Sequence, residues 1–129
     1  MFNRVILVGR LTKDPELRHT PQGTPVATIT LAVNREYRKD DGTTDTDFFD
    51  VVIWGKIAEA VGKHGYKGQL VLIQGEMRSR SYEDKQGQKR KVWEVVANKV
   101  KFLEWRKQDE VDLADFGTEI EIDPEDVPF

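Results

Sequence analysis

The chain has 129 residues, 20 basic and 23 acidic side chains, and no cysteine. This length has room for one domain, and a chain without cysteine can form neither a disulfide framework nor a thiolate metal site. No apolar run approaches the ~20 residues that span a bilayer, and charge appears too early at the N-terminus for a signal peptide. We therefore expect a soluble, cytoplasmic protein.

The pattern of apolar residues predicts a β-rich body. Ala27, Ile29 and Leu31 alternate with polar threonines, as on a strand that is buried on one face. Glycine, proline and aspartate cluster between the apolar stretches and indicate turns. The five expected strands are residues 2–11, 25–33, 46–54, 69–82 and 89–103.

One helix is expected over residues 56–63, where Ile57, Ala58 and Val61 crowd one side and nearby glycines end the helix. Five strands with a helix between the third and the fourth is the element order of the OB-fold, a small, partly open barrel. The sequence thus predicts an all-β domain with one short helix, a five-stranded OB-fold barrel over residues 1–106.

Charge is divided unevenly between this body and the C-terminal tail. Residues 108–129 contain nine acidic and no basic side chains, which leaves a net charge of +6 in the first 107 residues. The tail has few large apolar groups, so burial cannot offset the entropy lost on ordering it. We expect a disordered acidic tail over residues 107–129 and a basic body suited to nucleic acid.

Strand alternation places two large aromatic side chains on the outside of the barrel. Phe49, Val51 and Ile53 of the third expected strand share the core face. Phe48 and Trp54 therefore point outward, where large aromatic groups call for an explanation.

Two further aromatic residues lie among cations. Tyr82 follows Arg78 and Arg80 on one face of the fourth expected strand, and Tyr37 lies beside Arg35 near a hairpin tip. Single-stranded nucleic acid is bound by this combination, because unpaired bases stack on aromatic rings while cations neutralise the phosphates. The candidate interface comprises Tyr37, Phe48, Trp54, Tyr82, Arg35, Arg38, Lys39, Lys56, Arg78, Arg80 and Lys85.

Packing within the barrel or in an interface is the alternative role for each of these aromatic residues. It is the role that we assign to Trp93 and Trp105, which the charge pattern singles out less clearly.

Catalysis and metal binding find no support in the sequence. Asp45, Asp47 and Asp50 resemble ligands for a hard cation, but alternation separates Asp50 from the other two, and turn chemistry and solvated charge account for them. The two histidines are remote from any nucleophile, and no phosphate-binding glycine loop is present. We expect a protein that is not an enzyme and that has no cofactor and no metal site.

Five stretches of sequence, taken together, are specific enough to indicate a protein family. They are NRVILVGRL at 3–11, DPELR at 14–18, VIWGKIAE at 52–59, GEMRSRSY at 75–82 and DVPF at 126–129. A chain with these motifs resembles the bacterial single-stranded DNA-binding proteins, the SSB family of replication, over nearly its full length.

The resemblance implies roles for particular residues. Four aromatic positions of that family stack with bases, and they match Tyr37, Phe48, Trp54 and Tyr82. The family forms homotetramers through surfaces that include the first strand, which suits the outward Ile6 and Val8. Its C-terminal tip binds partner proteins, with the terminal Phe in a hydrophobic pocket. The implied partner-binding residues are Asp123, Pro124, Glu125, Asp126, Val127, Pro128 and Phe129.

The implied function is sequence-independent binding of single-stranded DNA at the nucleoid, which protects the strand and recruits replication, recombination and repair proteins. A specialised paralogue for recombination or DNA uptake is an alternative. It is favoured because the tail joins the barrel almost directly, without a long spacer rich in glycine, proline and glutamine before the tip. An OB-fold RNA-binding module and an interaction adaptor with incidental DNA contact also remain open.

Overall fold

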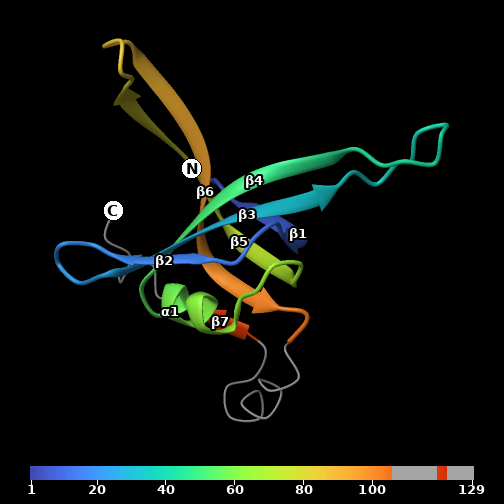
Figure 1. Ribbon diagram of the computed structural model, residues 1–129, viewed down its shortest axis with the longest axis horizontal. Coiled ribbons are helices and arrows are strands. Elements are labelled where there is room, and N and C mark those ends of the chain that lie inside the picture. Colours follow the sequence, from blue (N-terminus) through green and yellow to red (C-terminus); the bar gives the residue numbers. More distant parts are fainter. Residues whose placement is uncertain (106–118, 122–129) are drawn as a thin grey trace.

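The computed structural model describes residues 1–105 and the backbone of residues 119–121. The principal elements are β1 (Val5–Leu11), β3 (Pro25–Asn34), β4 (Thr46–Trp54), α1 (Gly55–His64), β5 (Leu70–Glu83) and β6 (Lys89–Phe102). The strands pair in the order β1-β5-β6-β4-β3, and β3 pairs again with β1, so the five strands close into a barrel (Figure 1). The predicted five-stranded OB-fold barrel, with its helix between the third and fourth of these strands, is confirmed.

Alternate residues of the strands build the barrel core, as the sequence predicts. Ile29 and Leu31 of β3 and Val51 and Ile53 of β4 are almost completely buried. Helix α1 packs against β3 and adds Ile57 to the same apolar cluster. The outer faces of β3 and β4 are thereby left for polar and exposed aromatic residues.

A bulge interrupts the pairing of β5 with β6. The register shifts between Gln74 and Gly75, and Asn98 is the extra residue on β6. Because the extra residue exchanges the two faces of the strand, β6 turns Ala97 toward the core before the bulge and Val100 after it. The sequence gives no sign of this exchange.

Two short strands add to the predicted elements. β2 (Glu16–His19) pairs with β3, and β7 (Glu119–Glu121) pairs with β6, where its ends are in register with Lys99 and Lys101. Both pairings are antiparallel. The rest of the tail lies outside the described residues, as do its predicted disorder and the predicted domain boundary after residue 106.

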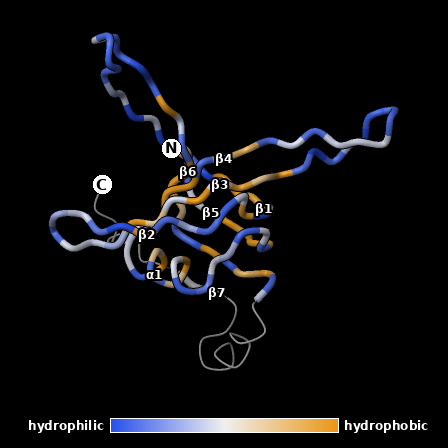
Figure 2. The backbone as a smooth tube through the Cα atoms, viewed as in Figure 1, coloured by the Kyte–Doolittle hydropathy of each residue, from blue (hydrophilic) through white to orange (hydrophobic). Residues whose placement is uncertain are grey.

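Two hairpins extend beyond the barrel as the β3–β4 arm, residues 33–47, and the β5–β6 arm, residues 78–94 (Figure 1). The first arm turns at Asp41, whose Oδ1 accepts hydrogen bonds from the backbone N–H and the hydroxyl of Thr43. The second turns at Asp84, whose Oδ1 accepts the backbone N–H of Gln86. Figure 2 shows mainly hydrophilic arms, while the apolar segments gather in the barrel. The arms are therefore held by turns and ladders rather than by a core of their own.

Candidate nucleic-acid interface

The four predicted stacking residues lie on the two arms and on the outer face of β4. Tyr37 is 60% exposed, Phe48 66% and Tyr82 44%, whereas Trp54 is partly buried. Phe48 and Trp54 share the outer face of β4, because Val51, of the opposite parity, lies in the core. An exposed ring offers a flat apolar surface on which an unpaired base can stack, and stacking at these four positions stays a prediction.

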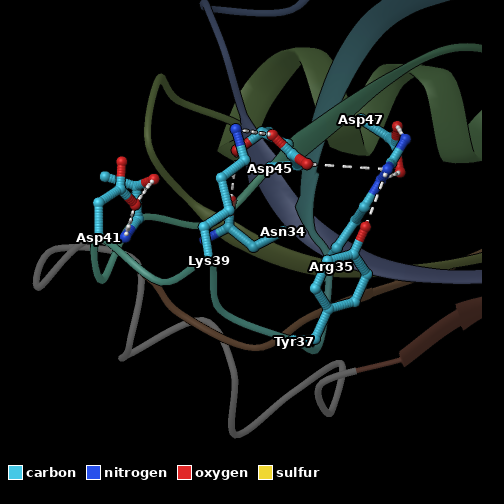
Figure 3. A network of polar contacts seen from close by, with 9 residues as sticks. Asn34, Arg35, Tyr37, Lys39, Asp41, Asp45 and Asp47 are labelled. Atoms are coloured by element: carbon cyan, nitrogen blue, oxygen red, sulfur yellow. Dashed lines mark hydrogen bonds and ion pairs between the residues drawn. The ribbon is translucent and has the colours of Figure 1, made fainter.

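Arg35 positions Tyr37 on the β3–β4 arm (Figure 3). Its Nε and Nη2 each donate a hydrogen bond of 3.1 Å to the Asp47 carboxylate, and its Nη1 donates one of 3.3 Å to the Tyr37 hydroxyl. The hydrogen bonds from Arg35 lower the pKa of Asp47, and those to Asp47 and Tyr37 raise the pKa of Arg35 above its usual value. The guanidinium therefore ties the phenol end of Tyr37 to β4 and leaves the ring open.

Several of the predicted phosphate-binding cations also have acidic neighbours. Besides Arg35, the paired cations are Lys39 with Asp45 at 2.7 Å, Arg78 with Glu76 at 2.7 Å and Arg80 with Glu94 at 3.2 Å. Such exposed ion pairs are weak, so a phosphate can take the place of the carboxylate. The predicted cations that form no ion pair with any described residue are Arg38, Lys56 and Lys85.

The two remaining tryptophans differ from one another. Trp105 packs against Phe102, with ring centroids 4.9 Å apart, and against His64 at 5.1 Å, so the packing role predicted for it is confirmed. Trp93 is 58% exposed on the β5–β6 arm, with Lys91 Nζ 5.0 Å from its ring centroid. Packing within the barrel is therefore wrong for Trp93, because the arm on which it lies has no core, and packing in an interface stays a prediction.

Ile6 and Val8, predicted for an oligomer interface, lie on the outer face of β1. They are 59% and 45% exposed, and Leu7 between them packs against the core. An exposed β-branched pair of this kind is typical of a surface that another chain covers. Assembly itself stays a prediction. The tip, residues 123–129, lies outside the described residues.

The acidic residues considered as metal ligands have other partners. Asp45 and Asp47 lie beside the cations of the β3–β4 arm, and Asp50 accepts a hydrogen bond of 3.1 Å from the Thr30 hydroxyl. The described part of the chain contains no group of three acidic, histidine or cysteine residues arranged to hold a metal ion. Nor does any helix in it have the length and apolarity to cross a membrane.

A closed five-stranded barrel with exposed aromatic and basic side chains on two hairpin arms defines an OB-fold protein of the kind that binds oligonucleotides. The model of the single-strand binding protein family matches residues 2–103. The chain belongs to the single-strand binding protein family.

Curated relatives agree with this membership. The chain is 44% identical to "Single-stranded DNA-binding protein 2" of Clostridium acetobutylicum, over 99% of this chain and 100% of the relative. It is 50% identical to "Single-stranded DNA-binding protein 3" of the same organism, over 81% of this chain and 72% of the relative. It is 55% identical to "Single-stranded DNA-binding protein" of Clostridium tetani, again over 81% and 72%.

Proposed function

We propose that the chain binds single-stranded DNA without regard to sequence, coats exposed strands at the nucleoid and keeps them from pairing again. The observation that carries the proposal is the placement of aromatic rings on both arms and on the outer face of β4, with Arg35 bonded to Tyr37 on one arm and Arg78 and Arg80 on the strand of Tyr82 on the other. Bases stack on Tyr37, Phe48, Trp54 and Tyr82, and each stacked base contributes ~1–3 kcal/mol. No covalent bond is made or broken, so the protein is not an enzyme.

The decisive experiment removes the rings together. Tyr37→Ala, Trp54→Ala and Tyr82→Ala are combined in one chain, and its affinity for a fluorescently labelled dT oligomer is compared with that of the unaltered protein. The matched control is Leu103→Ala, which shortens a 40% exposed apolar side chain just beyond the end of β6 that is distant from the arm. An unchanged affinity in the triple variant would refute the proposal and favour an adaptor whose DNA contact is incidental.

Phosphate contacts predict the dependence of affinity on salt. Each phosphate that a cation neutralises contributes about −0.7 to the slope of log K against log salt concentration for a single strand. Arg38, Lys56 and Lys85 are the cations most ready to contribute, because no acid of the described chain is paired with them. A binding curve that hardly changes with salt would contradict this part of the proposal.

The rival nucleic acid is RNA. Recognition of RNA commonly relies on polar contacts to the 2′-hydroxyl, whereas stacking and charge neutralisation serve either sugar. Competition between matched DNA and RNA oligonucleotides decides between them. A clear preference for RNA would replace the proposal with an RNA-binding module.

We further infer that the chain assembles as a homotetramer and recruits replication, recombination and repair proteins through residues 123–129. Ile6 and Val8 support the assembly, and the acidic tip with its terminal Phe supports the recruitment. A specialised paralogue for recombination or DNA uptake is the alternative within the family. Relatives numbered 2 and 3 occur together in one organism, and their occurrence supports this alternative.

A further inference from the structure

Trp93 forms a second exposed aromatic site on the β5–β6 arm, on the opposite face from Tyr82. We propose that Trp93 is an additional stacking site for an unpaired base, with Lys91 supplying the adjacent positive charge. The inference rests on the proposed binding of single-stranded DNA and extends it to a face of the arm that the predicted interface leaves out.

The pairing of β5 with β6 fixes which side chains share a face of the arm. Met77 is directly opposite Val95, and both turn toward the core. Two residues farther along each strand, Ser79 is opposite Trp93, so Trp93 continues this face. Tyr82 has the opposite parity and points from the other side of the hairpin.

The surroundings of Trp93 suit a base better than a protein partner. Lys91 lies over one side of the ring at 5.0 Å, and Ser79 opposite is too small to cover it. On this face Lys91, Ser79 and Ser81 are exposed and polar, while Met77 and Val95, on the barrel side of Trp93, turn toward the core, so Trp93 is the large apolar side chain that this part of the arm exposes. Protein interfaces instead have a contiguous apolar centre. A base can stack on the ring face that Lys91 leaves open.

Charge also favours a strand of phosphates on this face. On the Tyr82 face, cations and acids are matched, with Arg78 on Glu76 at 2.7 Å, Arg80 on Glu94 at 3.2 Å and Arg90 on Asp84 at 3.0 Å. On the Trp93 face, neither Lys89 nor Lys91 forms an ion pair with a described residue, and Glu83, opposite Lys89 in the register, is the acid that shares the face. The unpaired lysines therefore leave this side of the arm positive and able to attract a phosphate backbone.

Two aromatic sites on opposite faces of one arm predict a dependence on strand length. A short oligomer can lie on β4 and the Tyr82 face alone. A longer strand can pass around the edge or the tip of the arm and stack on Trp93 as well. Loss of Trp93 should then weaken the binding of long strands while leaving short ones nearly unaffected.

The test compares Trp93→Ala, Trp93→Phe and the control Leu103→Ala on dT oligomers from about 4 to about 70 nucleotides, which span one to several OB-fold sites. We expect Trp93→Ala to weaken binding of the longer oligomers about 5- to 150-fold, the equivalent of one lost stacked base. Trp93→Phe should restore most of that loss, because the ring is kept. Ultraviolet crosslinking to dT oligomers that carry 5-iodouracil should join a base to the peptide that contains Trp93.

Three outcomes would overturn the inference. One is an unchanged affinity of Trp93→Ala at every length while Tyr82→Ala lowers it, which leaves the proposed function intact. Another is a change in assembly mass by light scattering without a crosslink at Trp93, which would assign the residue to contacts between copies. The third is no effect of either Tyr82→Ala or Trp93→Ala, which would remove the proposed function as well.

Discussion

Arg35 holds Asp47 through two hydrogen bonds of 3.1 Å across the β3–β4 arm, and the same guanidinium reaches the Tyr37 hydroxyl at 3.3 Å. The guanidinium thus makes three hydrogen bonds within its own arm, two of them to a single carboxylate. We expect it to contribute to binding DNA mainly by fixing the direction of the Tyr37 ring.

Arg35→Ala should therefore lower the affinity for dT oligomers through Tyr37. We expect a loss of about two- to tenfold, the scale of one hydrogen bond. Asp47→Asn tests the same network at the acceptor, because it weakens the hydrogen bonds that orient Arg35 and removes no cation. If Arg35 acted only by attracting phosphate, Arg35→Ala would weaken a Tyr37→Ala protein as much as the unaltered one, and a double-mutant cycle measures this.

The barrel and the outward aromatics of β4 were predictable, because strand alternation in Ile29, Val51 and their neighbours runs without interruption. The face of the β5–β6 arm on which Trp93 lies could not be predicted. Counting back from Phe102 by twos places Trp93 on the outside with Tyr82, and the bulge at Asn98 reverses that assignment.

The ion pairs of the arms could not be predicted from the sequence either. Arg35 and Asp47 are twelve positions apart, and their contact depends on the register of β3 with β4, in which Val33 is opposite Asp47. Composition shows a cation near an aromatic residue, but not whether the cation is already paired. Register is a property of the folded sheet.

Gly75 should tolerate no larger side chain. A Cβ at this position would lie 2.0 Å from the Val96 carbonyl oxygen and 2.8 Å from the Ala97 Cα, both of them main-chain atoms. Gly75→Ala must push the strands apart at the bulge, and we expect it to lower the free energy of unfolding by about 1–3 kcal/mol. Urea denaturation measures the change. Ser79→Ala, on an exposed part of the same strand, is the control and should stay within about 0.5 kcal/mol.

Glu104 links the end of the barrel to the start of the tail and should make stability depend on pH. Its Oε1 accepts a hydrogen bond of 2.7 Å from Arg10 and one of 3.0 Å from the Leu70 N–H, and these contacts lower the pKa of Glu104. A carboxyl whose pKa is lower in the folded than in the unfolded chain stabilises the fold above its unfolded pKa and loses that contribution as the pH falls through its folded pKa.

The free energy of unfolding of the Glu104→Gln protein should therefore change less between pH 6 and pH 3 than that of the unaltered protein. The glutamine keeps an acceptor for Leu70 and lacks the titrating group. Urea denaturation at a series of pH values supplies the comparison. Parallel curves for the two proteins would show that Glu104 takes no part in the acid sensitivity, and Asp84, whose pKa is lowered by the Gln88 N–H and by Arg90, would be the next residue to vary.

The outer face of β1 predicts the state of assembly. Ile6 and Val8 are opposite Gln74 and Leu72 of β5, so Leu72 shares one outer surface with the two β-branched residues. Ile6→Glu combined with Val8→Glu would place two charges where a second copy is expected to pack, and an unpaired buried charge is strongly unfavourable. Light scattering should report a tetramer for the unaltered protein and a smaller species for the variant. Leu103→Glu, which adds a charge to an exposed apolar position elsewhere, should leave the mass unchanged. A tetramer that survives both β1 substitutions would place the interface on another surface of the barrel.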